Sequence, residues 1–416
     1  MVSKSKLKEK IICVVGLGYV GLPLALEFSK YFSVIGFDIN NEKICNLKKN
    51  LVNINLTSDS SQIKKADYII IAVPTPINKS KEPDLSFVES ASKIVGRNLK
   101  KGATIVLEST VYPGVTEDIV GPIIEKESGF KKIIDFKLGY SPERINPGDK
   151  DHTINKINKI VAGINKDTTE ELAKIYGKIT RVYKISNIKI AEAAKVIENI
   201  QRDLNIALMN ELAIIFHMMD LDTKAILDAA SSKWNFHRYN PGLVGGHCIP
   251  VDPYYLVYKA KEVGYDPQVI LAGRAINDYT PKYVGMMAIE GLNKVGKVIK
   301  DSKILIMGLT YKQNVSDTRE SPVKTLIKEL RKFGSSLYAY DPLLSTEKIL
   351  EFEVKNYDDS NIKYDCIIFT VAHEEFKKMK FEEIKKIMKN NPVLIDVTGL
   401  FNKNMAIKNG FYYQTL

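Results

Sequence analysis

Cysteine and histidine are scarce in this chain of 416 residues, which has four cysteines and five histidines. Cys13, Cys45, Cys248 and Cys366 lie far apart, with no Cys-x-x-Cys pair and no histidine at ligand spacing. This pattern argues against a disulfide framework and against a zinc site, so no metal is expected. A reducing, cytoplasmic compartment fits best.

Long apolar runs are missing as well. The one candidate, residues 11–28, follows a lysine-rich start, as the apolar part of a secretion signal would. Glycines and a proline break this stretch, and it is short for a membrane span. We therefore expect neither a secretion signal nor a membrane partner.

Clustered charge is also absent, although the formal net charge is +11. The lysines are spread along the whole chain and form no basic arm or block. A spread surplus is typical of solvated helix surfaces, with a few cations kept for a phosphate-bearing ligand. Nucleic acid is therefore not an expected partner.

The sequence does contain short β-rich apolar runs that alternate with stretches of helical periodicity. The expected strands form two series, at 11–15, 34–37, 68–73, 104–107 and 137–140, and at 303–307, 336–340, 366–370 and 393–396. Between them, residues 188–219 lack proline and glycine and predict one long helix, and helical periodicity returns at 267–296. The fold class is therefore α/β, with two separate domains of parallel sheet wrapped by helices.

A glycine fingerprint, GLGYVG at 16–21, follows the first expected strand, and Asp38 ends the second. Such glycines let the backbone approach a pyrophosphate at a helix N-terminus, while the acid binds the adenosine ribose hydroxyls. A carboxylate at Asp38 repels a 2′-phosphate, which favours NAD over NADP. The fingerprint alone leaves FAD open.

Two later loops begin at strand ends, where open α/β sheets place ligands. In the loop AVPTP at 72–76, ligand contact and ordinary loop punctuation explain Pro74 and Pro76 equally well. In the loop ESTVYPG at 108–114, Thr110 is the stronger candidate, because a hydroxyl has little other reason to end a buried strand.

On the long helix, Lys195, Asn199 and Arg202 are spaced to project from one face. A solvated polar stripe is the ordinary explanation. Asparagine, however, is a poor helix former, and lysine with asparagine supplies donors for a developing oxyanion. Glu198 and Asp203 point elsewhere, where simple exposure explains them.

Two further loops carry charge. In SPERINPG at 141–148, Glu143 is a candidate to activate water, and Arg144 to bind phosphate or a substrate carbonyl. In the loop after the first strand of the second series, Lys312 and Arg319 suit a diphosphate. A surface ion pair with a neighbouring acid is the alternative for this second loop.

The segment PGLVGGHCIPVDP at 241–253 sets Cys248 behind paired glycines and four residues before Asp252. A cysteine placed in this way is a candidate nucleophile. Free cysteine is usually a small buried hydrophobe, and the segment alone supports both interpretations equally.

Together, the motifs GLGYVGLPLA, VPTP, STVYPG, SPERINPGD, AEAAKVIENIQRDLNIALMNELA, NPGLVGGHCIPVDPYY and GLTYKQNVSDTRESP resemble those of the UDP-glucose/GDP-mannose dehydrogenase family. The likeness runs from about residue 10 to about residue 400, in the family's order. The SPERINPGDK and PGLVGGHC blocks look most like the branch that oxidises UDP-N-acetylhexosamines to uronic acids. Within that branch, UDP-N-acetylglucosamine is the first choice.

The resemblance implies a four-electron oxidation of the sugar C6 alcohol that uses two NAD+ in turn. Cys248 would capture the aldehyde as a thiohemiacetal, which is oxidised to a thioester and released by water. Surface polysaccharide or glycan precursor synthesis is the implied role.

The resemblance also implies residue roles. Lys195 and Asn199 would stabilise the alkoxide and the tetrahedral species, with Lys195 moving the hydroxyl proton, and Asp252 would organise water or act as a base. Glu143 and Thr110 would orient water for thioester hydrolysis.

For the ligands, Arg202 and Gly245 would line the nucleotide-sugar site, Lys312 would reach the sugar, and Arg319 would meet the NAD diphosphate. Arg238 would reach the nucleotide across a homodimer interface. The expected NAD site comprises Gly16, Gly18, Tyr19, Val20, Gly21, Asp38, Lys43, Val73, Pro74, Thr75, Thr110 and Arg319. The expected substrate site comprises Glu143, Arg144, Ile145, Lys195, Asn199, Arg202, Arg238, Tyr239, Gly245, His247, Tyr311 and Lys312.

The implied fold has two Rossmann-like doubly wound domains joined by a central long helix and a helical dimerisation domain. The expected boundaries are 1–186 for the NAD-binding domain, 187–298 for the central helical domain with the cysteine loop, and 299–416 for the UDP-sugar-binding domain.

One departure bears on the sugar. Family members that oxidise UDP-glucose carry a second glutamate four residues beyond the position of Glu143, where this chain has Pro147. Glucose as the preferred sugar is therefore in doubt, and UDP-N-acetylmannosamine stays an alternative. His247, also absent from the glucose branch, either contacts substrate or only shapes the loop. A non-catalytic NAD or nucleotide-sugar regulator is the rival class, and it has no use for a nucleophile.

Overall fold

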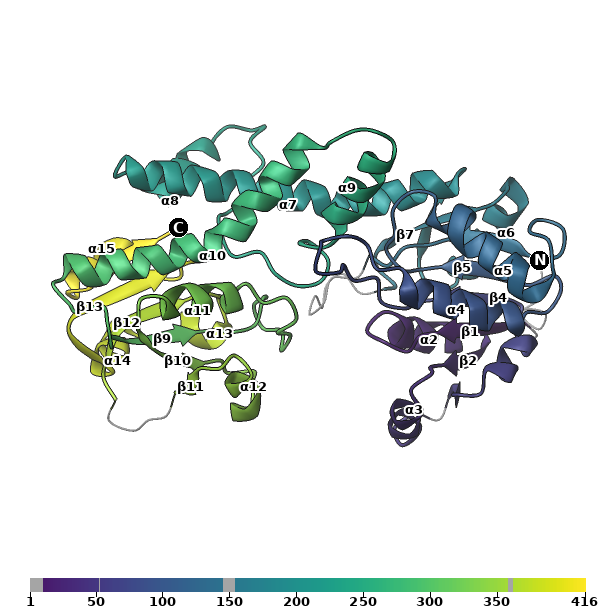
Figure 1. The fold of residues 1–416 in the computed structure, drawn as a ribbon, viewed down its shortest axis with the longest axis horizontal. Helices are drawn as coiled ribbons and strands as arrows, with labels where there is room; N and C mark the ends of the chain where they lie inside the picture. Colours follow the sequence, from purple (N-terminus) through teal and green to yellow (C-terminus); the bar gives the residue numbers. More distant parts are fainter. Residues whose placement is uncertain (1–9, 52, 145–153, 358–361) are drawn as a thin grey trace. The chain divides into compact units, whose positions relative to one another are not determined.

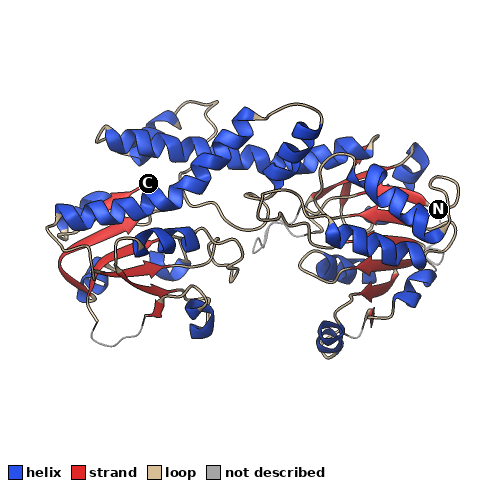
Figure 2. Cartoon of the chain, in the orientation of Figure 1, coloured by secondary structure: helices blue, strands red, loops and turns tan. Residues whose placement is uncertain are grey.

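The computed structural model describes residues 10–51, 53–144, 154–357 and 362–416, and Figures 1 and 2 show its helices and strands. The chain forms two compact units. Unit 1 comprises residues 1–198 and 251–266, and unit 2 comprises residues 199–250 and 267–416. Helix α7 (Ile188–Met218) begins in unit 1 and ends in unit 2.

Unit 1 is built on an eight-stranded sheet of order β3-β2-β1-β4-β5-β6-β7-β8. Its strands are β1 (Ile11–Val15), β2 (Ser33–Phe37), β3 (Asn55–Thr57), β4 (Tyr68–Ile71), β5 (Thr104–Leu107), β6 (Lys137–Tyr140), β7 (Asn158–Gly163) and β8 (Arg181–Ile185). The other helices of this unit are α2 (Gly21–Ser29), α3 (Asn41–Lys48), the 3₁₀ helix η1 (Ser60–Lys65), α4 (Ser86–Arg97), the π-helix η2 (Val115–Val120), α5 (Gly121–Ser128), α6 (Lys166–Tyr176) and α9 (Asp252–Glu262).

Unit 2 contains a six-stranded sheet of order β11-β10-β9-β12-β13-β14, with all pairs parallel. Its strands are β9 (Lys303–Met307), β10 (Ser336–Tyr340), β11 (Lys355–Asn356), β12 (Tyr364–Phe369), β13 (Met388–Asp396) and β14 (Tyr412–Thr415). Its helices, besides the second part of α7, are α8 (Thr223–Ala230), α10 (Gln268–Lys294), α11 (Val323–Arg331), α12 (Thr346–Leu350), α13 (Glu374–Lys377), α14 (Phe381–Lys386) and α15 (Lys403–Lys408).

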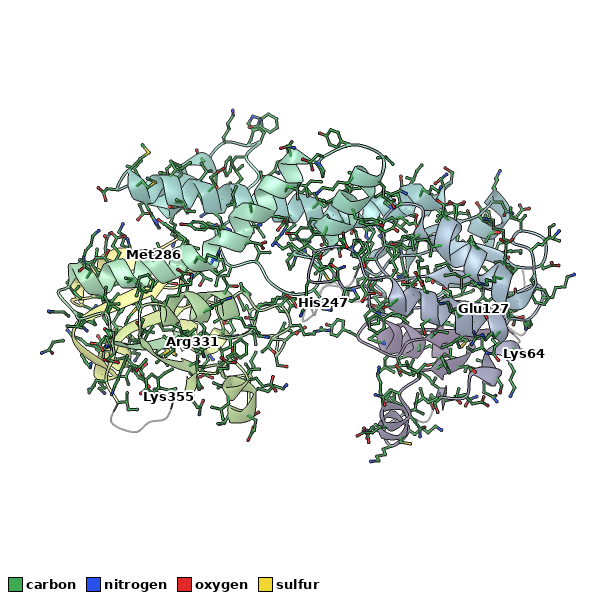
Figure 3. The ribbon with its side chains drawn as sticks, in the orientation of Figure 1. Lys64, Glu127, His247, Met286, Arg331 and Lys355 are labelled. Atoms are coloured by element: carbon green, nitrogen blue, oxygen red, sulfur yellow. The ribbon has the colours of Figure 1, made fainter. Side chains whose placement is uncertain are left out.

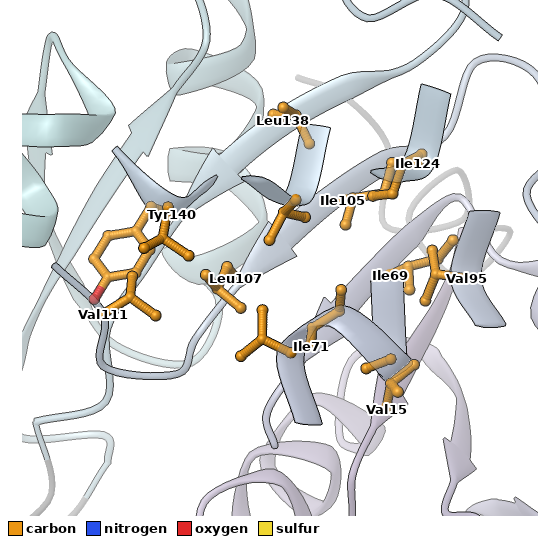
Figure 4. Packing of buried hydrophobic residues seen from close by; sticks show 14 of the residues in the cluster. Val15, Ile69, Ile71, Val95, Ile105, Leu107, Val111, Ile124, Leu138 and Tyr140 are labelled. Atoms are coloured by element: carbon orange, nitrogen blue, oxygen red, sulfur yellow. The ribbon is translucent and has the colours of Figure 1, made fainter. Parts of the chain in front are cut away.

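The central strands are largely apolar because helices cover both faces of each sheet. In β1, Cys13 and Val15 belong to one buried cluster of unit 1, whereas Ile12 and Val14 belong to another. Figure 4 shows the first cluster, in which side chains from β1, β4, β5 and β6 meet. Neighbouring residues of a strand point to opposite faces, so an unbroken apolar run requires two cores.

The α/β prediction is confirmed, with one correction. The sheet of unit 1 is mixed rather than wholly parallel, because β7 runs antiparallel to β6 and pairs Gly139 with Gly163. Antiparallel neighbours need no crossover helix between them, which is why the alternation of strand and helix in the sequence gave no sign of this pair.

Candidate active site

The fingerprint loop after β1 has no room for side chains at two of its glycines. Gly16 has a φ of 92°, and a Cβ there would lie 2.7 Å from the carbonyl oxygen of Ala72. A Cβ on Gly21 would lie 1.9 Å from the carbonyl oxygen of Gly16. Gly18 and Tyr19 are exposed. The backbone of this loop is therefore open to a ligand, as a pyrophosphate site requires.

Asp38, at the end of β2, faces this loop. Its carboxylate accepts hydrogen bonds from the backbone N–H of Leu17 at 3.0 Å and of Asn40 at 3.0 Å, and Lys43 Nζ lies 2.8 Å away. Burial opposes ionisation, but the hydrogen bonds from Lys43, Asn40 and Leu17 outweigh it and hold the pKa of Asp38 below its usual value. The carboxylate is thus ionised beside the loop, where it fits the ribose hydroxyls of NAD.

The loops after β4 and β5 are tied together by a residue that the sequence analysis missed. Ser109 accepts a hydrogen bond from the N–H of Val73 at 3.1 Å and donates one to the carbonyl oxygen of Val73 at 2.6 Å. Thr110 follows directly and is partly buried. Pro74 is exposed and Thr75 partly buried, so Val73, Pro74, Thr75 and Thr110 line neighbouring loop ends within unit 1.

A second missed residue, Glu192 of α7, holds the loop after Thr110. Its carboxylate accepts hydrogen bonds from Gly114 N at 2.6 Å, Thr116 N at 2.9 Å and Thr116 Oγ1 at 2.7 Å. Glu192 is fully buried, and burial raises its pKa to about 7 against the effect of these hydrogen bonds. An acid among the buried, apolar positions of the predicted helix was the available signal.

Glu143, in the loop after β6, is anchored from two sides. Its Oε1 accepts a hydrogen bond from the N–H of Arg144 at 2.6 Å, and its Oε2 lies 3.8 Å from the ammonium of Lys159. Arg144 pairs with Glu198 at 2.7 Å, so the simple exposure suggested for Glu198 is incomplete. Ile145 and Pro147 lie outside the described residues.

The polar face of α7 is more buried than a solvated stripe would be. Lys195 is 9 % exposed and Asn199 is 6 % exposed, whereas Arg202 is exposed. Lys195 belongs to unit 1 and Asn199 to unit 2. The expectation for Asp203 was wrong, because it is fully buried and pairs with Arg274 at 2.6 Å. A buried cation on α10, distant in sequence, satisfies it.

The cysteine loop of unit 2 packs closely on the loop after β9. A Cβ on Gly245 would lie 2.5 Å from Pro322 Cδ and 2.8 Å from Tyr311 Cβ. A Cβ on Gly246, whose φ is 83°, would lie 2.7 Å from the ring of Tyr311. Only glycine fits at these two positions, so the loop that carries Cys248 is held against Tyr311.

Cys248 differs from the buried cysteines of the chain. Cys13 and Cys366 are fully buried in strands, and burial raises the pKa of Cys13 to about 12 and that of Cys366 further. Cys248 is exposed. The interpretation as a small buried hydrophobe therefore fits Cys13 and Cys366 and does not fit Cys248, whose thiol is accessible.

His247 of the cysteine loop, labelled in Figure 3, lies near charged groups of the loop after β9 within unit 2. Burial and the nearby charge of Arg319 lower the pKa of His247, against the opposite effect of Asp317 and Glu320. Arg319 forms a bidentate ion pair with Asp317, at 3.0 Å and 2.6 Å. The ion pair that was the alternative interpretation for Arg319 is thus present, and it leaves the guanidinium half-exposed. Lys312 and Tyr311 are partly buried.

Asp252 is the first residue of α9 in unit 1 and is 4 % exposed. Its charge acts on the hydroxyl of Tyr140, whose pKa is raised mainly by burial and further by Glu192, Asp252 and Glu108. Three acids of unit 1 therefore converge at the carboxyl ends of β5 and β6.

The remaining two substrate candidates lie on the segment that precedes the cysteine loop. Arg238 pairs with Asp228 at 2.5 Å and is exposed. Tyr239 accepts a hydrogen bond from Gln201 at 3.0 Å.

The cysteine loop is also anchored at its start, again by a residue missed from the sequence. Asn210 of α7 accepts a hydrogen bond from Gly242 N at 2.8 Å and donates to Gly242 O at 3.1 Å and to Asn277 at 2.8 Å. Asn277 in turn donates to Asp203 at 2.8 Å. A buried network on α7 and α10 thus fixes the backbone six residues before Cys248.

Unit 2 contains a turn like that of the fingerprint loop, but the acid beside it has different partners. Gly308, whose φ is 103°, donates to Tyr340 O at 2.8 Å, as Gly16 donates to Phe37 O at 2.8 Å. Asp341 follows β10 and accepts from Leu309 N at 2.7 Å, but it is 1 % exposed and lies 3.3 Å from His373 Nε2.

The described ranges of the chain contain no cluster of three or more potential metal ligands and no helix long and apolar enough to span a membrane.

Comparison with known proteins gives matches along nearly the whole chain. Models of the UDP-glucose/GDP-mannose dehydrogenase family match its NAD binding domain at residues 10–55 and 48–180, its central domain at 189–279 and its UDP binding domain at 305–403. The UDP-N-acetyl-D-glucosamine 6-dehydrogenase of Pseudomonas aeruginosa is 44% identical over an alignment of 418 positions, which covers 96% of this chain and 99% of that protein.

A protein of the same name from Salmonella typhi is 46% identical and covers 94% of this chain and 96% of its own. Among solved structures, the UDP-D-ManNAc dehydrogenase of Pyrococcus horikoshii is similar with a TM-score of 0.86 and 29% identity, over 97% of this chain and 98% of that one.

Proposed function

Because this chain belongs to the UDP-glucose/GDP-mannose dehydrogenase family, we propose that it oxidises C6 of UDP-N-acetylglucosamine to the carboxylate, with NAD as the oxidant. The observation that carries the proposal is the exposed Cys248, on a loop whose glycines admit no side chain. The sugar is inferred from relatives of 44% and 46% identity that are named for it.

Bound NAD+ supplies the hydride acceptor for both oxidations. The residues that would hold it fit: the open backbone at Gly16 and Gly21, and the ionised Asp38. Val73, Pro74, Thr75 and Thr110 lie at the neighbouring strand ends. A buried lysine beside the substrate suits the first proton transfer, so Lys195 takes the C6 hydroxyl proton and, with Asn199, stabilises the alkoxide.

Cys248 then retains the aldehyde. Its sulfur adds to C6 to give a thiohemiacetal, which keeps the carbon in place for the second oxidation and yields a thioester. Hydrolysis forms a bond from a water oxygen to C6 and breaks the C–S bond. The sulfur leaves as thiolate, the sugar leaves as carboxylate, and both protons of the water are released. We assign the orientation of this water to Thr110 and Glu143, with Asp252 as the organising acid or base.

Substrate recognition involves side chains of α7, of the segment before the cysteine loop and of the loop after β9. Arg202, Arg238, Tyr239 and the Gly245 backbone line the nucleotide-sugar site in this proposal, and Lys312 reaches the sugar.

We also propose functional boundaries at 1–186, 187–298 and 299–416. The large exposed apolar side chains Met218, Met219 and Trp234 of unit 2 support a homodimer. An accessible catalytic thiol must stay reduced to act, which supports a reducing cytoplasm.

One experiment tests reaction and sugar together. Purified protein is incubated with NAD+ and UDP-GlcNAc, UDP-GalNAc or UDP-ManNAc in turn, and NADH is followed by absorbance. We expect two NADH per sugar, with UDP-GlcNAc fastest. One NADH with a stable aldehyde or ketone would remove the role of Cys248, and tight binding without turnover would favour a regulator. C248S should bind NAD but stall.

A further inference from the structure

Lys159 of β7 is a buried charge that the mechanism above does not use. It is 0 % exposed, and its ammonium donates hydrogen bonds to Glu108 Oε2 at 2.7 Å and to Pro142 O at 3.0 Å. The same nitrogen lies 3.8 Å from Glu143 Oε2. The ammonium therefore makes two hydrogen bonds, and its contact with Glu143 is an ion pair. Pro142 and Glu143 are consecutive residues of one loop, so Lys159 contacts this loop twice.

The charge on this lysine is maintained by its surroundings. Burial disfavours the ammonium, but Glu108 and Glu143 outweigh this effect and keep the pKa of Lys159 above its usual value, with a small opposing effect of Arg144. Tyr176 of α6 completes the cluster, donating to Glu108 Oε1 at 2.6 Å, and its ring centroid lies 5.7 Å from the ammonium.

Stability alone does not explain this arrangement. A buried ion pair can often be replaced by apolar residues without loss of stability, since both charges must be stripped of water. An apolar pair at positions 108 and 159, however, would leave the carbonyl of Pro142 without its donor and the carboxylate of Glu143 without its ion-pair partner. The ion pair therefore does something for the loop that packing cannot do.

We propose that Lys159 is a positioning residue for Glu143 in the hydrolysis of the Cys248 thioester. It holds the Pro142 carbonyl by a hydrogen bond and attracts Glu143 Oε2 as an ion pair, while the N–H of Arg144 donates to Oε1 at 2.6 Å. One hydrogen bond and one ion pair thus orient the carboxylate, which would meet the water in one orientation as the water oxygen bonds to C6 and the thiolate departs. This inference rests on the role proposed above for Glu143.

Three variants separate positioning from stability. In E108Q/K159M both buried charges are removed, which avoids leaving one of them uncompensated. E108Q alone keeps Lys159 and its contacts with Pro142 and Glu143. L172A leaves a cavity in the core of the same unit beside Gly139 and serves as the control for destabilisation.

The readout is rapid mixing with NAD+ and UDP-GlcNAc, with NADH absorbance and acid-quenched intact mass spectrometry. For E108Q/K159M we expect a burst of two NADH per active site, then turnover about 10-fold or more slower than wild type, with the sugar thioester retained on Cys248. E108Q and L172A should accumulate no thioester. A burst and steady state that fall together in E108Q/K159M, or a thioester that also accumulates in E108Q or L172A, would overturn the positioning role.

The wild-type enzyme separates failure of this inference from failure of the proposed function. Two NADH per sugar in the wild type, with no adduct in E108Q/K159M, overturns the inference alone. A wild type that does not release two NADH per UDP-sugar overturns the proposed function and the inference that rests on it.

Discussion

Asn210 and Gly242 form a reciprocal pair, in which one side-chain amide of α7 holds both the N–H and the carbonyl oxygen of a single residue in the cysteine loop, at 2.8 Å and 3.1 Å. The pair is partly buried and continues through the buried Asn277 to Asp203. Because a mobile loop cannot aim a thiol, this anchor would give Cys248 a defined position for the attack proposed above.

Replacing Asn210 with alanine should weaken both fold and catalysis. The backbone groups of Gly242 would lose their partners, which we expect to cost about 2 kcal/mol in the free energy of unfolding. Turnover should fall more than NAD affinity, because Asn210 belongs to unit 2 and the fingerprint loop to unit 1. Urea denaturation and NADH release would measure the two effects.

Asn205→Ala is the matched control, since Asn205 lies on the same helix and donates only to Gln201 O in its own turn. Equal losses of turnover in N205A and N210A would show that the anchor has no particular role.

Two glycines of the cysteine loop should respond oppositely to alanine. A Cβ at Gly245 would lie 2.5 Å from Pro322 and 2.9 Å from the carbonyl oxygen of Glu320, whereas a Cβ at Gly242 would meet nothing within 4 Å. G245A must displace the loop, and a displacement near 1 Å can cost about 100-fold in rate. G242A should keep near-normal turnover. Steady-state kinetics of both variants decide the point, and equal activity would contradict the close packing.

Loss of the Asp38 carboxylate should weaken NAD binding and relax the discrimination against NADP. A charge-assisted hydrogen bond to ribose is worth about 1.5–3 kcal/mol, so D38A should raise the Kd for NAD by about 10-fold or more. Removing the negative charge should also bring the two cofactors closer in affinity. Calorimetric titration with each cofactor measures this.

Glu42→Ala, an exposed acid of α3 near Asp38 in sequence, controls for the change in net charge. If E42A shifted the NAD to NADP ratio as much as D38A, a direct role of Asp38 would be excluded.

Glu192 should make stability depend on pH. Its pKa is raised to about 7 in the folded chain, mainly by burial, and is about 4.3 when unfolded. The protonated carboxyl therefore favours the folded state. This contribution is fully present below about pH 4.3 and is lost as the pH rises through about 7.

The test compares the free energy of unfolding of the wild type and of E192Q from about pH 4 to about pH 8. The wild type should lose about 3 kcal/mol relative to E192Q over this window. The measured quantity is how the difference in unfolding free energy between the two proteins changes with pH, because the glutamine also loses a hydrogen bond at every pH. Parallel curves would show that Glu192 does not titrate there.

Much of the fold could be predicted because the central strands are short, largely apolar runs in the sequence. The strands expected at 11–15, 104–107, 137–140, 303–307 and 336–340 have the same bounds in the structure, since burial on both faces makes them largely apolar. The strands that were missed lack this signature: β8 is mostly exposed, β3 and β11 are short, β7 contains Lys159, and β14 is short and only partly buried.

The candidate site divides in a similar way. Asp38 and Gly16 could be proposed from the sequence because the spacing of the fingerprint marks them, and Gly245 because the family resemblance implies it. Ser109, Lys159, Glu192 and Asn210 were not, because each acts through a partner that is distant in the chain or through the backbone of a loop. Pairing of this kind depends on the folded neighbourhood, which periodicity and spacing do not encode.

The similar turns at Gly16 and Gly308 differ in what the neighbouring acid is bound to. Both sheets end their second strand in an acid that accepts a hydrogen bond from the preceding turn, but Asp341 is sealed by His373 whereas Asp38 is not. The turn of unit 2 resembles a dinucleotide-binding turn, but Asp341, the acid in the position of the ribose acceptor, is bound to His373 inside the protein. With Asp341 bound in this way, the turn of unit 2 offers no free acid to the ribose of NAD, so in the proposed reaction NAD and the UDP-sugar would not compete for one site.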